Sequence, residues 1–178
     1  VVSHLHGMHV MEQGEGLPVV LVHGNPTWGF VWRKVAAELR PDRLRLVMPD
    51  LVGLGLSDHP RDLATHTLAF HVRQLATLLK LLDLKRFVLV VQDWGGPIGV
   101  GAAATMPERL AGLVVLNTAL TPPKPGFRPT PFHRFARVPI VSELAFRGAL
   151  FPSRGLQLAQ GDRSSIDATA RRAYRGVL

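Results

Sequence analysis

Four short apolar runs lie in the first two-thirds of the chain, and each of them predicts a β-strand. They span residues 18–23, 45–48, 87–91 and 110–116. The first run is apolar without alternation, which fits a sheet that is covered on both faces. Residues 67–82 differ, because their apolar positions recur at intervals of three and four and therefore predict an amphipathic helix.

Two further segments with helical character, residues 28–39 and roughly 95–105, make strands and helices alternate along the chain. This order predicts a parallel sheet connected by right-handed crossovers. Ligands bind beyond the C-terminal ends of the strands in such sheets, so polar residues that follow strands should converge on one rim. These residues are His23, Gly24, Asn25, Pro49, Asp50, Asp93, Trp94, Asn117 and Thr118.

The third apolar run ends abruptly at Asp93, which is followed by Trp94, Gly95, Gly96 and a run of small residues. This pattern predicts a buried strand, a tight turn and a closely packed helix, with the residue at the tip exposed where α/β-hydrolases place their nucleophile. A carboxylate at the tip favours attack on an electrophilic carbon. Taken alone, Asp93 could instead cap the helix that follows it.

After Asn117 the chain becomes rich in proline, and helical patterning returns at residues 140–150, so residues 119–178 are interpreted as a separate helical layer. This layer carries ten basic residues against three acidic ones, which accounts for most of the net charge of +8. The charge could serve an anionic substrate, nucleic acid or a membrane surface. We favour a solvated arginine-rich surface, because no aromatic residues interleave with the basic ones as a stacking platform for bases would require.

The composition of the chain limits the kinds of protein and of functional site that it can form. The chain has 178 residues, 47% of them hydrophobic, and no cysteine, which predicts one domain without disulfides or thiol chemistry and fits a cytoplasmic location. The N-terminus does not resemble a signal peptide, and no apolar run is long enough to span a bilayer. His4, His6 and His9 could be taken for a metal cluster, but their alternation fits one face of a strand, so we expect no metal.

Three motifs occur in order at the predicted strand ends: residues 23–28, 49–58 and 92–96. Together they resemble the haloalkane dehalogenases, a branch of the α/β-hydrolase superfamily, over roughly residues 15–120. The resemblance implies an α/β-hydrolase fold with a mainly parallel sheet and helices on both faces. It further implies that residues 1–120 form the N-terminal part of the core and 121–178 part of a helical cap, with C-terminal strands of the fold missing from this chain.

The resemblance also implies a reaction that needs no cofactor and no metal. Asp93 would displace a halide from a small apolar halogenated substrate, and water would then hydrolyse the aspartyl ester. Asn25 and Trp94 would donate hydrogen bonds to the leaving halide, and their backbone N–H groups to the later oxyanion. The other motif residues would shape the loops: His23, Gly24, Pro26, Gly95 and Gly96.

The chain departs from the family pattern at its catalytic base and acid, which are expected downstream of position 178. Asn117 stands where one dehalogenase group has a glutamate. Asn25 together with Asn117 resembles the third dehalogenase subfamily, and residues 116–119 resemble the β-lactone decarboxylases of olefin biosynthesis. Two reactions therefore stay open, and a noncatalytic basic binding module is the third possibility. Epoxide hydrolysis is disfavoured, because the one tyrosine, Tyr174, lacks a matching context.

We therefore expect the parent protein to be an enzyme and this piece alone to be inactive as a catalyst, because it cannot turn over. No nucleic-acid partner and no membrane insertion are expected. A homo-oligomer is possible, because the apolar face of an unfinished sheet favours self-association.

Overall fold

A computed structural model describes residues 1–120 and part of the remainder. The described positions after 120 are 126, 128, 130, 131, 134, 138, 155, 161, 162 and 165–177. The chain divides into two compact units, Val1–Thr121 and Pro122–Leu178. The helix predicted over residues 140–150 lies outside the described residues.

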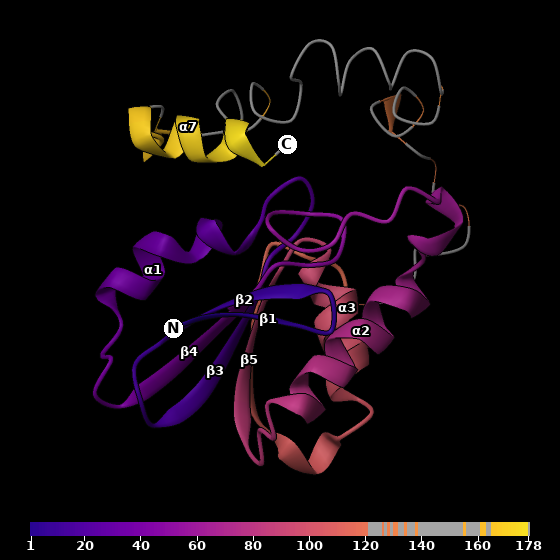
Figure 1. The fold of residues 1–178 in the computed structure, drawn as a ribbon. Coiled ribbons are helices and arrows are strands. Elements are labelled where there is room, and N and C mark those ends of the chain that lie inside the picture. Colours follow the sequence, from indigo (N-terminus) through magenta and orange to yellow (C-terminus); the bar gives the residue numbers. More distant parts are fainter. Residues whose placement is uncertain are drawn as a thin grey trace. The chain divides into compact units, whose positions relative to one another are not determined.

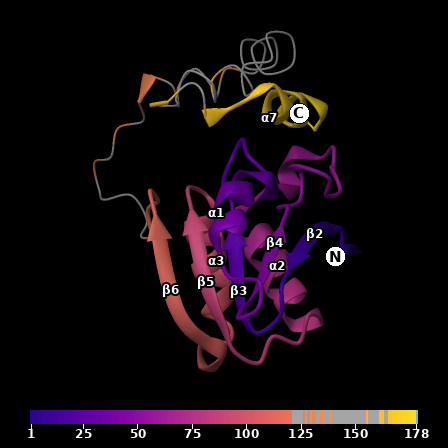
Figure 2. The ribbon, with the colours of Figure 1, turned by 90° about the vertical axis from the view of Figure 1, so that its left-hand side faces the viewer.

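The first unit is built on a sheet of six strands in the order β1-β2-β4-β3-β5-β6 (Figures 1 and 2). β4, β3, β5 and β6 are parallel, whereas β1 pairs with β2, and β2 with β4, in antiparallel fashion. All four strands predicted from apolar runs are confirmed. The strands are β1 (Val2–Leu5), β2 (Met8–Gln13), β3 (Leu17–Val22), β4 (Leu44–Pro49), β5 (Phe87–Gln92) and β6 (Leu110–Leu116).

The N-terminal hairpin formed by β1 and β2 corrects the interpretation of the first three histidines. They do not share one face of a single strand, because His6 lies in the connecting turn with φ of 52°. His4 and His9 instead pair in register across the hairpin. His4 lies 3.4 Å from the Asp58 carboxylate. In the part of the chain that the structure describes, no group of three or more histidine or acidic side chains is arranged to hold a metal ion.

Helices cover both faces of the sheet, as Figure 1 shows for α1 on one side and α2 and α3 on the other. The α2 and α3 side buries an apolar cluster that includes Val20, Leu78 and Ile98, and the α1 side buries a second one that includes Leu21 and Trp32. These two layers confirm the α/β-hydrolase architecture expected from the sequence. The helices are η1 (Gly29–Trp32), α1 (Arg33–Glu38), η2 (Leu63–Thr65), α2 (Leu68–Leu81), α3 (Gly95–Ala103) and η3 (Pro107–Arg109).

β6 forms the edge of the sheet opposite β1, and its residues from Leu113 to Leu116 are each 40–44% exposed. In the second unit, α7 (Ala168–Gly176) begins at Asp167, whose carboxylate accepts a hydrogen bond from the backbone N–H of Ala170. None of the helices among the described residues combines the length and apolar character needed to cross a membrane.

Candidate active site

The turn between β5 and α3 places Asp93 in the left-handed region of backbone conformation, with φ of 51°. Non-glycine residues seldom adopt this conformation, and they do so most often in turns or functional sites. Asp93 does not cap α3, because Trp94 occupies the N-cap position and no side chain caps the helix. The turn is closed by a hydrogen bond from the Gly96 N–H to the Asp93 carbonyl, at 2.9 Å.

The Asp93 carboxylate lies against the loop that follows β3. Its Oδ1 accepts a hydrogen bond from the backbone N–H of Asn25 at 2.9 Å. A Cβ atom at Gly24 would lie 2.2 Å from the same oxygen, so only glycine leaves room for the carboxylate here. The structure thus brings together two motifs that are 68 positions apart in the sequence.

His23 stabilises this loop through hydrogen bonds that involve both of its ring nitrogens. Nδ1 donates to the carbonyl of Gly24 at 2.9 Å, and Nε2 accepts from the N–H of Leu51 at 2.9 Å. A carbonyl can only accept, so the proton is on Nδ1. Complete burial lowers the pKa of His23, against the raising effects of the Gly24 carbonyl and of Asp50 and Asp93. The neutral ring has no free nitrogen for a substrate or a water.

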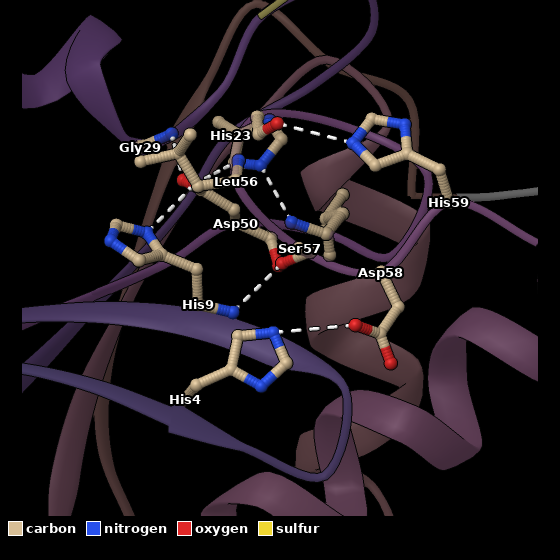
Figure 3. A network of polar contacts seen from close by, with 11 residues as sticks. His4, His9, His23, Gly29, Asp50, Leu56, Ser57, Asp58 and His59 are labelled. Atoms are coloured by element: carbon tan, nitrogen blue, oxygen red, sulfur yellow. Dashed lines mark hydrogen bonds and ion pairs between the residues drawn. The ribbon is translucent and has the colours of Figure 1, made fainter.

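Asp50 is a second buried carboxylate, and its contacts are with the scaffold. It accepts hydrogen bonds from the N–H of Gly29 at 2.7 Å, the N–H of Leu56 at 3.0 Å and Nδ1 of His9 at 2.9 Å. The hydroxyl of Ser57 donates to the Asp50 carbonyl at 2.7 Å. Figure 3 shows His9, Gly29 and Leu56, which come from three separate segments, around the Asp50 side chain. These contacts give Asp50 a structural role, because its carboxylate joins the hairpin to two loops.

Thr118 helps to hold the backbone of Asp93, a role that the sequence did not predict. It follows β6, and its hydroxyl donates to the Asp93 carbonyl at 2.5 Å. A Cβ atom at Gly96 would lie 2.1 Å from the same hydroxyl oxygen, so the glycine makes room for the threonine. The pattern placed Thr118 on the rim of the sheet, but an interaction through the backbone carbonyl leaves no signature in residue types. Gly95 packs in the same close manner against the end of β3.

A pocket of about 350 Å³ adjoins the turn between β5 and α3, although Asp93 itself is not among its lining residues. Trp94 and Asn25, the two residues predicted to bind halide, both line it, and the Trp94 side chain is 54% exposed. Most of the remaining wall is apolar, and it includes Leu51, Val52, Leu54 and Ile98. The region therefore combines a carboxylate, polar hydrogen-bond donors and an apolar cavity. The peptide bond between Asn25 and Pro26 in this loop is cis.

Comparison with known proteins identifies several relatives. The chain is 46% identical over 113 residues to a cis-3-alkyl-4-alkyloxetan-2-one decarboxylase of Shewanella oneidensis, covering 62% of this chain and 35% of the relative. It is 39% identical over 115 residues to haloalkane dehalogenase 2 of Mycobacterium bovis, covering 65% and 40%. The chain thus spans between a third and a half of the length of these curated relatives.

A solved structure of a haloalkane dehalogenase is also similar to this chain. The tetrameric haloalkane dehalogenase DpaA from Paraglaciecola agarilytica is similar with a TM-score of 0.74 and 29% identity, over 94% of this chain and 54% of that one. Residues 18–162 match the family model described as alpha/beta hydrolase fold. That match covers most of the chain and includes the strand ends at which Asn25 and Asp93 meet, so this chain belongs to the alpha/beta hydrolase fold family.

Proposed function

We propose that the parent enzyme hydrolyses a halogenated aliphatic compound through an ester on Asp93. The observation that carries this proposal is the position of the Asp93 carboxylate, at the tip of a left-handed turn and hydrogen-bonded to the Asn25 N–H at 2.9 Å. An ionised carboxylate needs no base for a displacement on saturated carbon. The curated relatives include enzymes named haloalkane dehalogenases, which supports this reaction class.

The two carboxylate oxygens would have different roles. Because Oδ1 is held by the Asn25 N–H, Oδ2 attacks the carbon, and the carbon–halogen bond breaks with its electron pair on the halide. Oδ1 then becomes the carbonyl oxygen of the ester. When water attacks the ester carbon, negative charge develops on Oδ1, where the Asn25 N–H is already placed to stabilise it. Cleavage of the bond between the carboxyl carbon and Oδ2 then releases the alcohol and regenerates Asp93.

Asn25 and Trp94 would stabilise the leaving halide. The side-chain amide of Asn25 and the indole N–H of Trp94 are donors, and both residues line the pocket next to the turn that carries Asp93. Donors already in place before the reaction stabilise developing charge without reorganisation. The histidine that would activate the hydrolytic water remains a proposed contribution from outside this chain.

A second candidate is decarboxylation of a β-lactone with the same aspartate. It is favoured by one observation, the 46% identity to a relative named as a cis-3-alkyl-4-alkyloxetan-2-one decarboxylase. The two candidates differ in their products, since the first releases halide and alcohol and the second releases carbon dioxide and an alkene. Offering a bromoalkane and a dialkyl β-lactone to the full-length parent protein distinguishes them.

The decisive experiment looks for the ester itself. Incubation of this chain with 1-bromohexane should add one hexyl group to the peptide that contains Asp93, detected by mass spectrometry, with release of one bromide per chain. Asp93→Asn should give no adduct. Asp83→Asn is a matched control, because Asp83 is also an aspartate with positive φ, of 48°, but is exposed at the end of α2. Equal labelling of wild type and Asp93→Asn would refute the proposal and favour a noncatalytic binding module.

A further inference from the structure

The pocket next to the turn between β5 and α3 has a wall that the proposed reaction does not use. This wall includes Gly53 from the loop after β4, His66 directly after η2, and His71 in α2. The pocket volume of about 350 Å³ falls within the range of roughly 300–1,000 Å³ that is usual for small-molecule sites. Because most of the lining is apolar, the molecule that fits has an aliphatic part, whose length is limited by the wall that it meets.

The His66 ring packs directly on the backbone of Gly53. A Cβ atom at Gly53 would lie 2.6 Å from Cε1 of His66, which is too close for any side chain. Gly53 also has φ of 85°, a left-handed conformation that glycine adopts without steric cost. Its turn is closed by a hydrogen bond from the Gly53 N–H to the Asp58 carbonyl at 2.8 Å. The bare backbone of this turn is therefore what lets the imidazole lie against the loop.

Two further contacts fix the orientation of the His66 ring. Its Nε2 donates a hydrogen bond to the Pro60 carbonyl at 3.0 Å, since a carbonyl can only accept. The His71 ring stacks on it, with centroids 5.6 Å apart and an interplanar angle of 29°. The loop after β4 and α2 thus hold the ring in place before any ligand binds. A longer ligand would have to break the hydrogen bond and the stacking to move this ring, so the wall resists displacement.

His66 and the reacting groups belong to different parts of the same pocket. Asn25 and Trp94 adjoin Asp93, the first through its backbone hydrogen bond and the second in sequence. The His66 ring instead contacts the loop after β4 and α2. An aliphatic molecule whose polar end lies between Asn25 and Trp94 therefore has room for its chain along the apolar lining, and His66 is a fixed obstacle within that lining.

We propose that the His66 ring limits the length of the alkyl chain that this pocket accepts. The substrate is then an aliphatic compound whose apolar end packs against the imidazole. The chemistry at its other end rests on the proposed function, whereas the length limit does not, because an alkyl β-lactone would bring a chain to the same wall. Each methylene buried along the lining strengthens binding roughly 4-fold until the chain meets the ring.

The first test measures the second-order rate at which 1-bromoalkanes of four to ten carbons label Asp93. In wild type this rate should rise roughly 4-fold per methylene and then stop rising at one chain length. His66→Ala leaves a cavity, so the rise should continue for about two more carbons. His66→Trp enlarges the ring, so the rise should stop earlier. The same limiting length in wild type and in both variants would overturn the proposal.

His59→Ala is a matched control for disturbance of the loop. His59 lies in the same loop, and its Nε2 also donates to a backbone carbonyl, that of Gly55 at 3.2 Å, but His59 is not among the residues that line the pocket. Its limiting chain length should equal that of wild type. An equal displacement of the limit by His59→Ala and His66→Ala would show that the loop, and not the ring, sets it, and would also overturn the proposal.

A second test needs no reaction at Asp93. Alkan-1-ols of the same lengths are titrated into wild type and both His66 variants, and binding is followed by the indole N–H resonance of Trp94, which lines the pocket. The dissociation constants should stop improving at a length that moves with the size of residue 66. A coinciding limit in all three proteins, or a Trp94 resonance that no alcohol moves, would refute the length limit. Absence of Asp93 labelling together with a limit that moves would refute only the proposed function.

Discussion

Replacing Thr118 by valine tests how the conformation of Asp93 is maintained. Valine keeps the branched shape that packs against Gly96 and removes only the hydroxyl that donates to the Asp93 carbonyl. After this change the carbonyl retains the hydrogen bond from the Gly96 N–H. The turn therefore closes with one hydrogen bond in place of two, and the residue that needs them has a positive φ.

The size of the effect follows from these contacts. A left-handed backbone costs a residue other than glycine roughly 1–2 kcal/mol. An ordinary neutral hydrogen bond contributes about 0.5–1.5 kcal/mol, which is comparable to that cost. Losing the Thr118 hydroxyl should therefore reduce the free energy of unfolding by about 1 kcal/mol. If the same energy is lost from the placement of the carboxylate, labelling of Asp93 slows by roughly 5-fold.

The assay is the rate of ester formation with 1-bromohexane, sampled by rapid quenching and mass spectrometry. Because displacement by Asp93 precedes any use of a base, this step can be measured on the chain as it is. The maximal rate should fall in Thr118→Val while the half-saturating concentration changes little, since Thr118 is not among the residues that line the pocket. Thr118→Ser keeps the hydroxyl and should retain most of the rate. Equal losses in the valine and serine variants would show that packing, and not the hydrogen bond, accounts for the effect.

Three further predictions concern the scaffold around the site. Burial lowers the pKa of His23, so below about pH 6.5 the unfolded chain binds a proton that the folded chain excludes. In urea titrations the free energy of unfolding should therefore fall by up to about 1.4 kcal/mol for each unit by which the pH is lowered in this range, and by less in His23→Gln. Gly96→Ala should destabilise the fold by about 1–3 kcal/mol, because its Cβ would overlap Thr118. Gly161→Ala, whose Cβ would meet nothing within 4 Å among the described residues, should be nearly neutral in the same titration. Asp50→Asn should cost about 1–3 kcal/mol by leaving a buried donor unpaired, and a midpoint of thermal unfolding equal to that of wild type would contradict this.

The fold could be predicted because its signals are local. Continuous apolar runs mark β3, β4, β5 and β6, and the spacing of leucines marks α2, whose cap at Thr67 accepts from the N–H of Phe70. The meeting of Asn25 with Asp93 also follows, because parallel strands bring their C-terminal ends to one rim.

Other parts depend on contacts that residue types do not record. The hairpin of β1 and β2 was missed because its short strands carry histidine, methionine and serine in place of an apolar run. The role of Thr118 depends on a backbone carbonyl, so it becomes visible only when β6 is packed beside β5.

The convergence of three segments on Asp50 has a consequence for engineering this scaffold. His9 from the N-terminal hairpin, Gly29 at the start of η1 and Leu56 from the loop after β4 share a single buried carboxylate. Randomising any one of these loops in a mutant library therefore disturbs the other two. Trimming the first ten residues would do the same, although none of them lines the pocket. Libraries aimed at new substrates are better directed at Leu54 and Leu68, which face the cavity.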